Sequence, residues 1–143
     1  MVTNNPLSPS ANLEWKHIDD GRWRKNGSQI SESGQNGMLV INDKVKAEGP
    51  HRVGRWLKSG IPLYRDADNK LYLWEAASGK KIAGFLQTQK EIAPYLSDLA
   101  AYGPKFYDEI PVGIQTAGEI YPKYLPVTVP EDQIPARFGV SPL

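Results

Sequence analysis

The chain contains no cysteine, which excludes disulfide bonds, thiolate nucleophiles and metal sites with sulfur ligands. It has two histidines, His17 and His51, and neither has a second ligand at the spacing of a metal site. Its apolar runs, such as residues 38–41 and 82–86, are far shorter than the ~20 residues that span a bilayer. We therefore expect a protein without cofactor or metal that does not enter a membrane.

The sequence also lacks a strong excess of one charge. Seventeen lysines and arginines face 16 aspartates and glutamates, for a formal net charge of +1. Residues 15–25 do interleave aromatic and basic side chains, as platforms for single-stranded nucleic acid do. With so little net charge we expect no nucleic-acid partner. Buried indoles with a cationic rim are one alternative; we favour Trp15 and Trp23 as anchors for a protein partner, since Trp and Arg dominate interface hot spots.

No pattern typical of an enzyme stands out. Residues 66–77 begin like a calcium loop, but Leu71 stands where that loop needs glycine and Ala77 where it needs glutamate. The adjacent acids at 19–20 and at 108–109 resemble a hydrolytic pair, yet neighbouring acids on polar segments are usually just solvated. We expect no enzymatic activity. A cell-wall hydrolase that uses Asp108 or Glu109 is the weaker alternative.

Glycine and proline are abundant, with 13 and 12 copies in 143 residues, whereas the pair usually supplies about 12% of a chain. Both residues interrupt long helices. The composition therefore predicts a mainly β protein with short strands, extended loops and at most one or two short helices.

The chain divides into an arm and a domain. Residues 1–12 are polar and contain two prolines, so they bury too little surface to order alone. Residues 13–36 scatter apolar side chains among turn-forming clusters. We predict a flexible arm over residues 1–36 that orders on binding, and one β-rich domain over residues 37–143.

Within the domain, residues 61–65 and 70–74 predict two strands joined by a turn at 66–69, and residues 81–88 a third strand, together a meander. Alternation places Ile61 and Leu63 on one face, and Leu71 and Leu73 together on one face of the partner strand. Shorter strands are expected at 38–41 and 52–57, and residues 94–102 predict either a short helix or an irregular loop with a single turn. Six prolines in residues 111–143 predict an extended segment that wraps along a surface.

These segments carry a family resemblance. Residues 58–63 read Lys-Ser-Gly-Ile-Pro-Leu, the turn and the strand at 70–74 follow, and residues 82–86 read Ile-Ala-Gly-Phe-Leu. This succession resembles the central signature of tailed-phage head decoration proteins, the lambda-type family and its relatives in phages of actinobacteria. Residues 112–113, 118–120 and 125–126 are similar to late strands of the actinophage members. The resemblance covers roughly residues 50–143, and residues 89–108 depart from the shorter lambda-type pattern.

The resemblance implies a β-clip-like core, homotrimers, and an arm that binds the major capsid protein. The protein would be a structural cement on the outer surface of the virion, assembled in the host cytoplasm. Capsid binding would use Leu7, Leu13, Trp15, Arg22, Trp23 and Arg24 of the arm. Packing of the core or the trimer would use Leu63, Leu71, Leu73, Trp74, Phe85 and Leu86.

The main alternative is a carbohydrate-binding module or a virion adhesin. Sugars would stack on the four tryptophans, provided that these were exposed together. The residues in question are Trp15, Trp23, Trp56 and Trp74.

Overall fold

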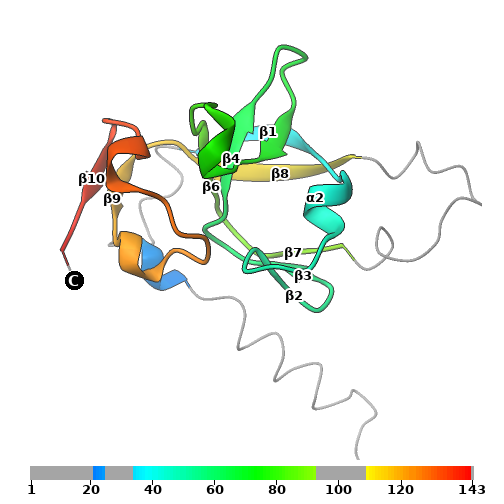
Figure 1. Cartoon of the computed structure of the whole chain (residues 1–143), viewed down its shortest axis with the longest axis horizontal. Helices are drawn as coiled ribbons and strands as arrows, with labels where there is room; N and C mark the ends of the chain where they lie inside the picture. The colour runs from blue at the N-terminus through cyan, green and yellow to red at the C-terminus, as the bar shows by residue number, and fades with distance from the viewer. Residues whose placement is uncertain (1–20, 25–33, 93–108, 143) are drawn as a thin grey trace, which may run out of the picture.

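A computed structural model describes residues 21–24, 34–92 and 109–142, and within these ranges the chain is mainly β (Figure 1). The strands are β1 Gly34–Val40, β2 Arg52–Val53, β3 Trp56–Leu57, β4 Pro62–Arg65, β5 Leu71–Leu73, β6 Gly84–Leu86, β7 Lys90–Glu91, β8 Glu109–Gln115, β9 Gly118–Ile120 and β10 Phe138–Val140. One α-helix and four 3₁₀ helices accompany them in these ranges: η1 Gly21–Trp23, α2 Asp43–Lys46, η3 Ala76–Ser78, η6 Pro122–Tyr124 and η7 Glu131–Gln133. The predicted fold class is confirmed.

Five strands form a closed barrel in the order β1–β5–β4–β6–β8, and β8 returns to pair with β1. The β1–β8 ladder is the longest, from Gly34 opposite Gln115 to Val40 opposite Glu109. Neighbouring strands are antiparallel apart from β1 and β5, which meet in parallel where Leu39 lies opposite Leu71. Closure of the ring removes most of the unpaired strand edges that an open sheet exposes.

The predicted hairpin is present as β4 and β5. Its turn is closed by the Asp66 N–H, which donates to the Lys70 carbonyl at 3.0 Å, and by the Asn69 N–H, which donates to the Asp66 carbonyl at 2.8 Å. Asn69 adopts a φ of 64°, a left-handed conformation that asparagine tolerates better than most residues. Leu63 lies opposite Leu73, and both side chains are buried, as the alternation predicts.

The predicted meander is wrong in its third strand. β6 pairs with β4 and not with β5: Phe85 lies opposite Pro62, and Gly84 lies opposite Leu63. Alternation identifies a strand and its buried face but does not determine its neighbour, and residues 74–83 are long enough to carry the chain past β4. Gly84 suits this place, because a Cβ atom there would lie 2.5 Å from the Gln115 carbonyl oxygen of β8.

Two shorter strands also differ from expectation. The strand expected at 38–41 begins earlier, at Gly34. The strand expected at 52–57 is broken by Gly54, whose φ of 55° turns the chain into a hairpin of β2 and β3. β3 also pairs with β7, which makes a separate three-stranded sheet. The short helix or loop expected at 94–102 lies outside the described residues.

The proline-rich tail supplies β8, β9 and β10 with 3₁₀ turns between them. Pro111 lies in the part of β8 that pairs with β1, whereas β6 reaches β8 at Ile114 and Gln115. Proline has no N–H to donate to a strand ladder. It is therefore tolerated on a side of its strand where no further strand pairs. β9 and β10 form a parallel two-stranded sheet beside the barrel (Figure 1).

Buried apolar side chains form two clusters. The barrel core comprises Leu39, Ile41, Val45, Leu57, Ile61, Leu63, Leu71, Leu73, Leu86, Ile92, Ile110, Val112 and Ile114. The aromatic core comprises Trp23, Trp74, Ile82, Phe85, Ile120, Leu125, Val129 and Phe138. The second cluster therefore joins β6 to both the amino-terminal η1 and the carboxyl-terminal β9–β10 region.

Candidate functional site

Trp23, expected to fill a pocket on the capsid protein, lies inside the domain. Its side chain has no solvent exposure, and its ring centroid is 5.8 Å from that of Phe85. The indole Nε1–H donates to Ser59 Oγ at 2.8 Å, and Ser59 Oγ donates onward to the Gln87 carbonyl at 3.1 Å. The expectation that Trp23 contacts a partner is therefore corrected. Apolar neighbours that are distant in sequence, such as Phe138, give this tryptophan a core of its own chain.

The two arginines that flank Trp23 make different contacts. Arg24 Nη1 donates to the Gln87 carbonyl at 2.6 Å, and its guanidinium lies 4.7 Å from the centre of the Trp23 ring. Arg22 is exposed, and its guanidinium lies 4.8 Å from the centre of the Tyr124 ring of η6. η1 and η6 lie against one another, as Figure 1 shows. Of these two, Arg22 therefore presents the more accessible charge to a partner.

The remaining arm residues, Leu7, Leu13 and Trp15, lie outside the described residues, and their predicted role stays a prediction. The boundary between arm and domain moves, however. Residues 21–24 pack against the domain and β1 begins at Gly34, so parts of the expected arm belong to the folded unit.

The six residues assigned to core or trimer packing are all buried within the single chain. Four of them line the barrel core: Leu63, Leu71, Leu73 and Leu86. The other two, Trp74 and Phe85, belong to the aromatic core. All six side chains therefore pack within the chain, and a role between copies stays a prediction.

The tryptophans do not form the common surface that the carbohydrate-binding alternative needs. Trp23 and Trp74 are buried, with 0% and 2% exposure. Trp56 of β3 is half-buried, and Trp15 lies outside the described residues. A sugar platform that includes Trp23 and Trp74 is therefore excluded in this conformation.

The acidic and imidazole groups that the sequence offered for chemistry have structural partners where they are described. Glu109 forms an ion pair with Lys70 across the barrel. His51 is buried, and its Nε2 lies 2.9 Å from the Val45 carbonyl, which ties β2 to α2. Asp108, the acidic pair at 19–20 and His17 lie outside the described residues. The described residues contain no group of three or more acidic or histidine side chains that could hold a metal ion.

The β4–β5 turn carries the one strongly perturbed pair among the described titratable groups. Tyr72 Oη donates to Asp68 Oδ2 at 2.6 Å. This hydrogen bond is the main cause that lowers the pKa of Asp68 and raises the pKa of Tyr72 to about 12. The Lys70 N–H also donates to Asp68, at 3.1 Å. Asp68 therefore stays charged and the Tyr72 hydroxyl stays neutral, which suits a turn rather than acid–base catalysis.

A surface cleft of about 650 Å³ lies between residues 76–82 and residues 132–137. Its charged lining residues are Lys80, Lys81, Arg137 and Asp132, and its apolar ones include Ile82 and Ile134. No sequence pattern indicates this cleft. Its two walls lie about 50 residues apart in the chain, and no motif links them. We call it the basic cleft.

No known protein family, curated protein or solved structure matches this chain. Among the helices in the described part of the chain, none has the length and apolar character needed to cross a bilayer.

Proposed function

We propose that this chain is a structural decoration protein that binds the outer surface of a phage head as trimers and stabilises the shell. Two features of the molecule support the proposal. The first is the place of the signature residues in the fold. Residues 58–86 supply β4, β5 and β6, which are adjacent strands of the barrel. The segment that carries the family resemblance is thus the centre of the domain.

The second feature, which carries the proposal, is the fixed root of the amino-terminal segment. Trp23 is held by Ser59 and by the aromatic core, and the Tyr121 N–H donates to the Trp23 carbonyl at 2.7 Å. The residues before Gly21 are therefore tethered at one defined point of the domain. A tethered polar segment with Leu7, Leu13 and Trp15 suits attachment to a neighbouring protein.

In the proposed mechanism, residues 1–20 add as a strand to an exposed sheet edge of the major capsid protein. Main-chain hydrogen bonds give affinity, and Leu13 and Trp15 fill pockets. Three arms on one trimer convert modest single contacts into tight attachment. The decoration protein then stabilises the shell by mass action, because it binds the assembled lattice and not its dissociated subunits.

The test is co-sedimentation with expanded, undecorated heads of the phage that encodes the chain. Full-length protein is compared with a variant that lacks residues 2–20, which leaves Trp23 and β1 in place. We expect the full-length protein to bind, and the truncated form to bind weaker by a factor of about 100.

A variant with residues 2–20 in scrambled order is the matched control, because it keeps length and charge. Binding by the scrambled variant equal to that of the native order would overturn the arm mechanism. If no form of the protein sediments with the heads and the protein clearly binds sugars on a glycan array, the adhesin alternative replaces the proposal.

A further inference from the structure

We infer that the basic cleft is a second contact for the capsid protein and binds an acidic, extended peptide segment of it. This inference rests on the proposed function and adds a site on the folded domain to the one on the arm. None of the predicted site residues that the structure describes lines the cleft. Three features of the cleft point to such an occupant: walls held by hydrogen bonds, an excess of positive charge and an apolar floor.

The cleft is already formed, because hydrogen bonds hold both walls. In the first wall, Trp74 Nε1–H donates to the Lys80 carbonyl at 2.8 Å. The second wall is tied to the first by Arg137, whose Nη2 donates to the Ala83 carbonyl at 2.6 Å and to the Ile82 carbonyl at 3.2 Å. Arg137 Nε also donates to the Thr116 carbonyl at 2.5 Å. A peptide that binds here pays little to order the site.

The described residues neutralise the cations of the cleft only in part. The Lys80 ammonium lies 3.9 Å from Asp66, at the outer limit of an ion pair, and its side chain is 49% exposed. Lys81 is exposed and has no ion pair among the described residues. Arg137 adds a third positive charge, and Asp132 is the single acidic residue among the described residues of the lining. The cleft thus carries an excess of positive charge and suits an acidic occupant.

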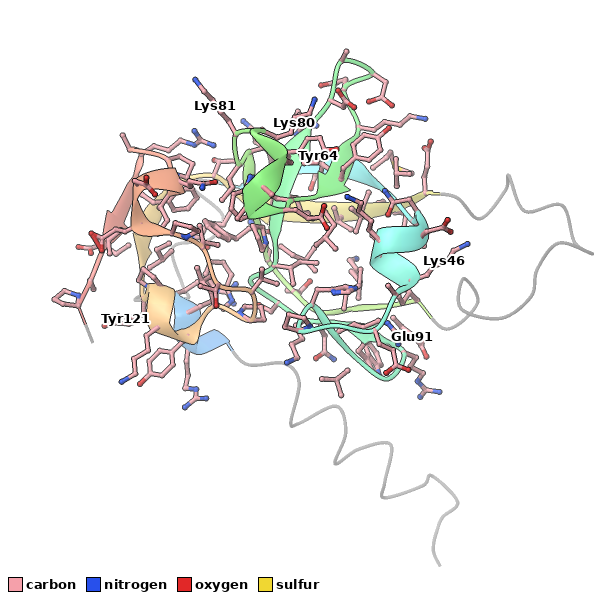
Figure 2. The ribbon with its side chains drawn as sticks, in the orientation of Figure 1. Lys46, Tyr64, Lys80, Lys81, Glu91 and Tyr121 are labelled. Carbon is pink, nitrogen blue, oxygen red and sulfur yellow. The ribbon has the colours of Figure 1, made fainter. Side chains whose placement is uncertain are left out.

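The apolar part of the lining narrows the choice of occupant. Ile82 is buried beneath the cleft, and Ile134 is half-buried beside it. The described lining residues include no aromatic ring on which a sugar would stack. Figure 2 shows Lys80 and Lys81 on one side of the molecule, with Tyr64 close to Lys80. A segment that pairs a carboxylate with an aliphatic side chain therefore fits better than an acidic sugar.

The experiment measures binding of full-length variants to the same undecorated heads across a range of salt concentrations. Lys80→Glu with Lys81→Glu reverses two charges in the cleft. Lys46→Glu with Lys123→Glu is the matched control, since both side chains are exposed and lie on α2 and η6, away from the cleft. We expect the cleft variant to bind about tenfold weaker, with a shallower salt dependence, and the control to stay within about twofold.

A second variant, Ala136→Trp, fills the cleft without a change of charge and is expected to weaken binding as much. Far-UV circular dichroism and thermal unfolding show whether each variant is folded. If wild type binds and both cleft variants bind like the control, the cleft contact is overturned while the proposed function stands. If wild type does not bind, both fail. Binding of polygalacturonate oligosaccharides to the free protein, lost in the charge-reversed variant, would assign the cleft to acidic glycans instead.

Discussion

The barrel core and the aromatic core differ in composition and in the parts of the chain that build them. The barrel core is entirely aliphatic and comes from residues 39–114. The aromatic core instead joins Trp23 near the amino terminus, Trp74 and Phe85 in the middle, and Phe138 near the carboxyl terminus. Its rings touch directly: the centroids of Phe85 and Phe138 lie 5.0 Å apart in an edge-to-face arrangement.

β6 is the wall that the two cores share. Leu86 belongs to the barrel core and Phe85 to the aromatic core, because successive side chains of a strand point to opposite faces. The difference between the cores teaches how the molecule is organised. Strand pairing and alternation build the barrel, whereas the aromatic core closes both ends of the described chain onto the outside of that barrel. It is also the core that holds Trp23, the buried residue of η1.

The largest effect is expected from Trp23→Ala, which empties the centre of the aromatic core. Loss of a fully buried indole costs about 3–5 kcal/mol, and the change also removes the donor to Ser59. Urea unfolding measures the loss. Trp23→Phe keeps an aromatic ring near Phe85 and is expected to lose roughly half as much.

Hydrogen exchange in Trp23→Ala then separates the two cores. We expect amides of β9 and β10 to lose protection, while the Leu86 N–H, bonded to the Ile61 carbonyl at 2.9 Å, stays protected in the barrel. Equal loss of protection in both regions would show that the cores open as one unit.

The next largest effect is expected from Leu63→Ala in the barrel core. Leu63 is fully buried, and truncation to alanine leaves a cavity that costs about 3 kcal/mol. Because β4 lies between β5 and β6, we expect amides of the barrel and of the aromatic core to lose protection together. Val53→Ala, at a site 36% exposed, is the control and is expected to change the free energy of unfolding by about 0.5 kcal/mol or less. If the amides of β9 and β10 keep their protection from hydrogen exchange, the aromatic core does not depend on the barrel core in this way.

A smaller effect is expected where the two cores meet, at Gly60. Its φ is 92°, and a Cβ atom there would lie 2.9 Å from the Trp23 ring. Gly60→Ala therefore combines backbone strain with a clash, at a cost of about 2 kcal/mol. Gly79→Ala is the matched control, because Gly79 has a φ of 75° but nothing within 4 Å of the added atom. It is expected to cost about 1 kcal/mol, the strain alone. Equal losses of stability for the two variants in thermal unfolding would show that Trp23 yields to the added methyl group.

The barrel core is the part of the molecule that the sequence predicted best. Leu71 and Leu73 of β5 lie on either side of Tyr72, and Leu73 lies opposite Leu63 of β4, so this shared buried face follows from the two-residue period. The position of β6 could not be predicted in the same way. The alternation of side chains in β6 is equally compatible with pairing to β4 or to β5. The close contact of Gly84 with Gln115 becomes visible once β6 and β8 are both placed.

Trp23 was assigned to a partner, and the basic cleft was not predicted, for a related reason. Trp23 sits among turn-forming residues, where an indole that anchors a partner and one that anchors its own domain look the same. Its contact with Ser59 spans 36 positions. In the cleft, Arg137 reaches the Ala83 carbonyl across 54 positions. Hydrogen bonds to backbone carbonyls have no residue-specific partner, so no sequence pattern reveals them.

The smallest effect is expected outside both cores, at the exposed pair of Tyr72 and Asp68. The pKa of Tyr72 is raised from 10.0 to about 12, so its contribution to stability is present below pH 10 and is lost as pH rises toward 12. The lowered pKa of Asp68 contributes stability above the ordinary carboxyl range, and that contribution is lost as the pH falls through the lowered value. Tyr72→Phe removes the hydroxyl and with it most of the pH dependence of stability at both the alkaline and the acidic end.

Carbon-13 NMR of the Asp68 carboxyl group measures this change most directly. In Tyr72→Phe we expect the pKa of Asp68 to rise toward its ordinary value, with a small remaining shift from the Lys70 N–H. Tyr64→Phe is the control, because the Tyr64 ring stacks on Tyr72 at 5.4 Å while the hydroxyl bonded to Asp68 belongs to Tyr72. An Asp68 titration that does not move in Tyr72→Phe would mean that the backbone of the turn holds this carboxylate.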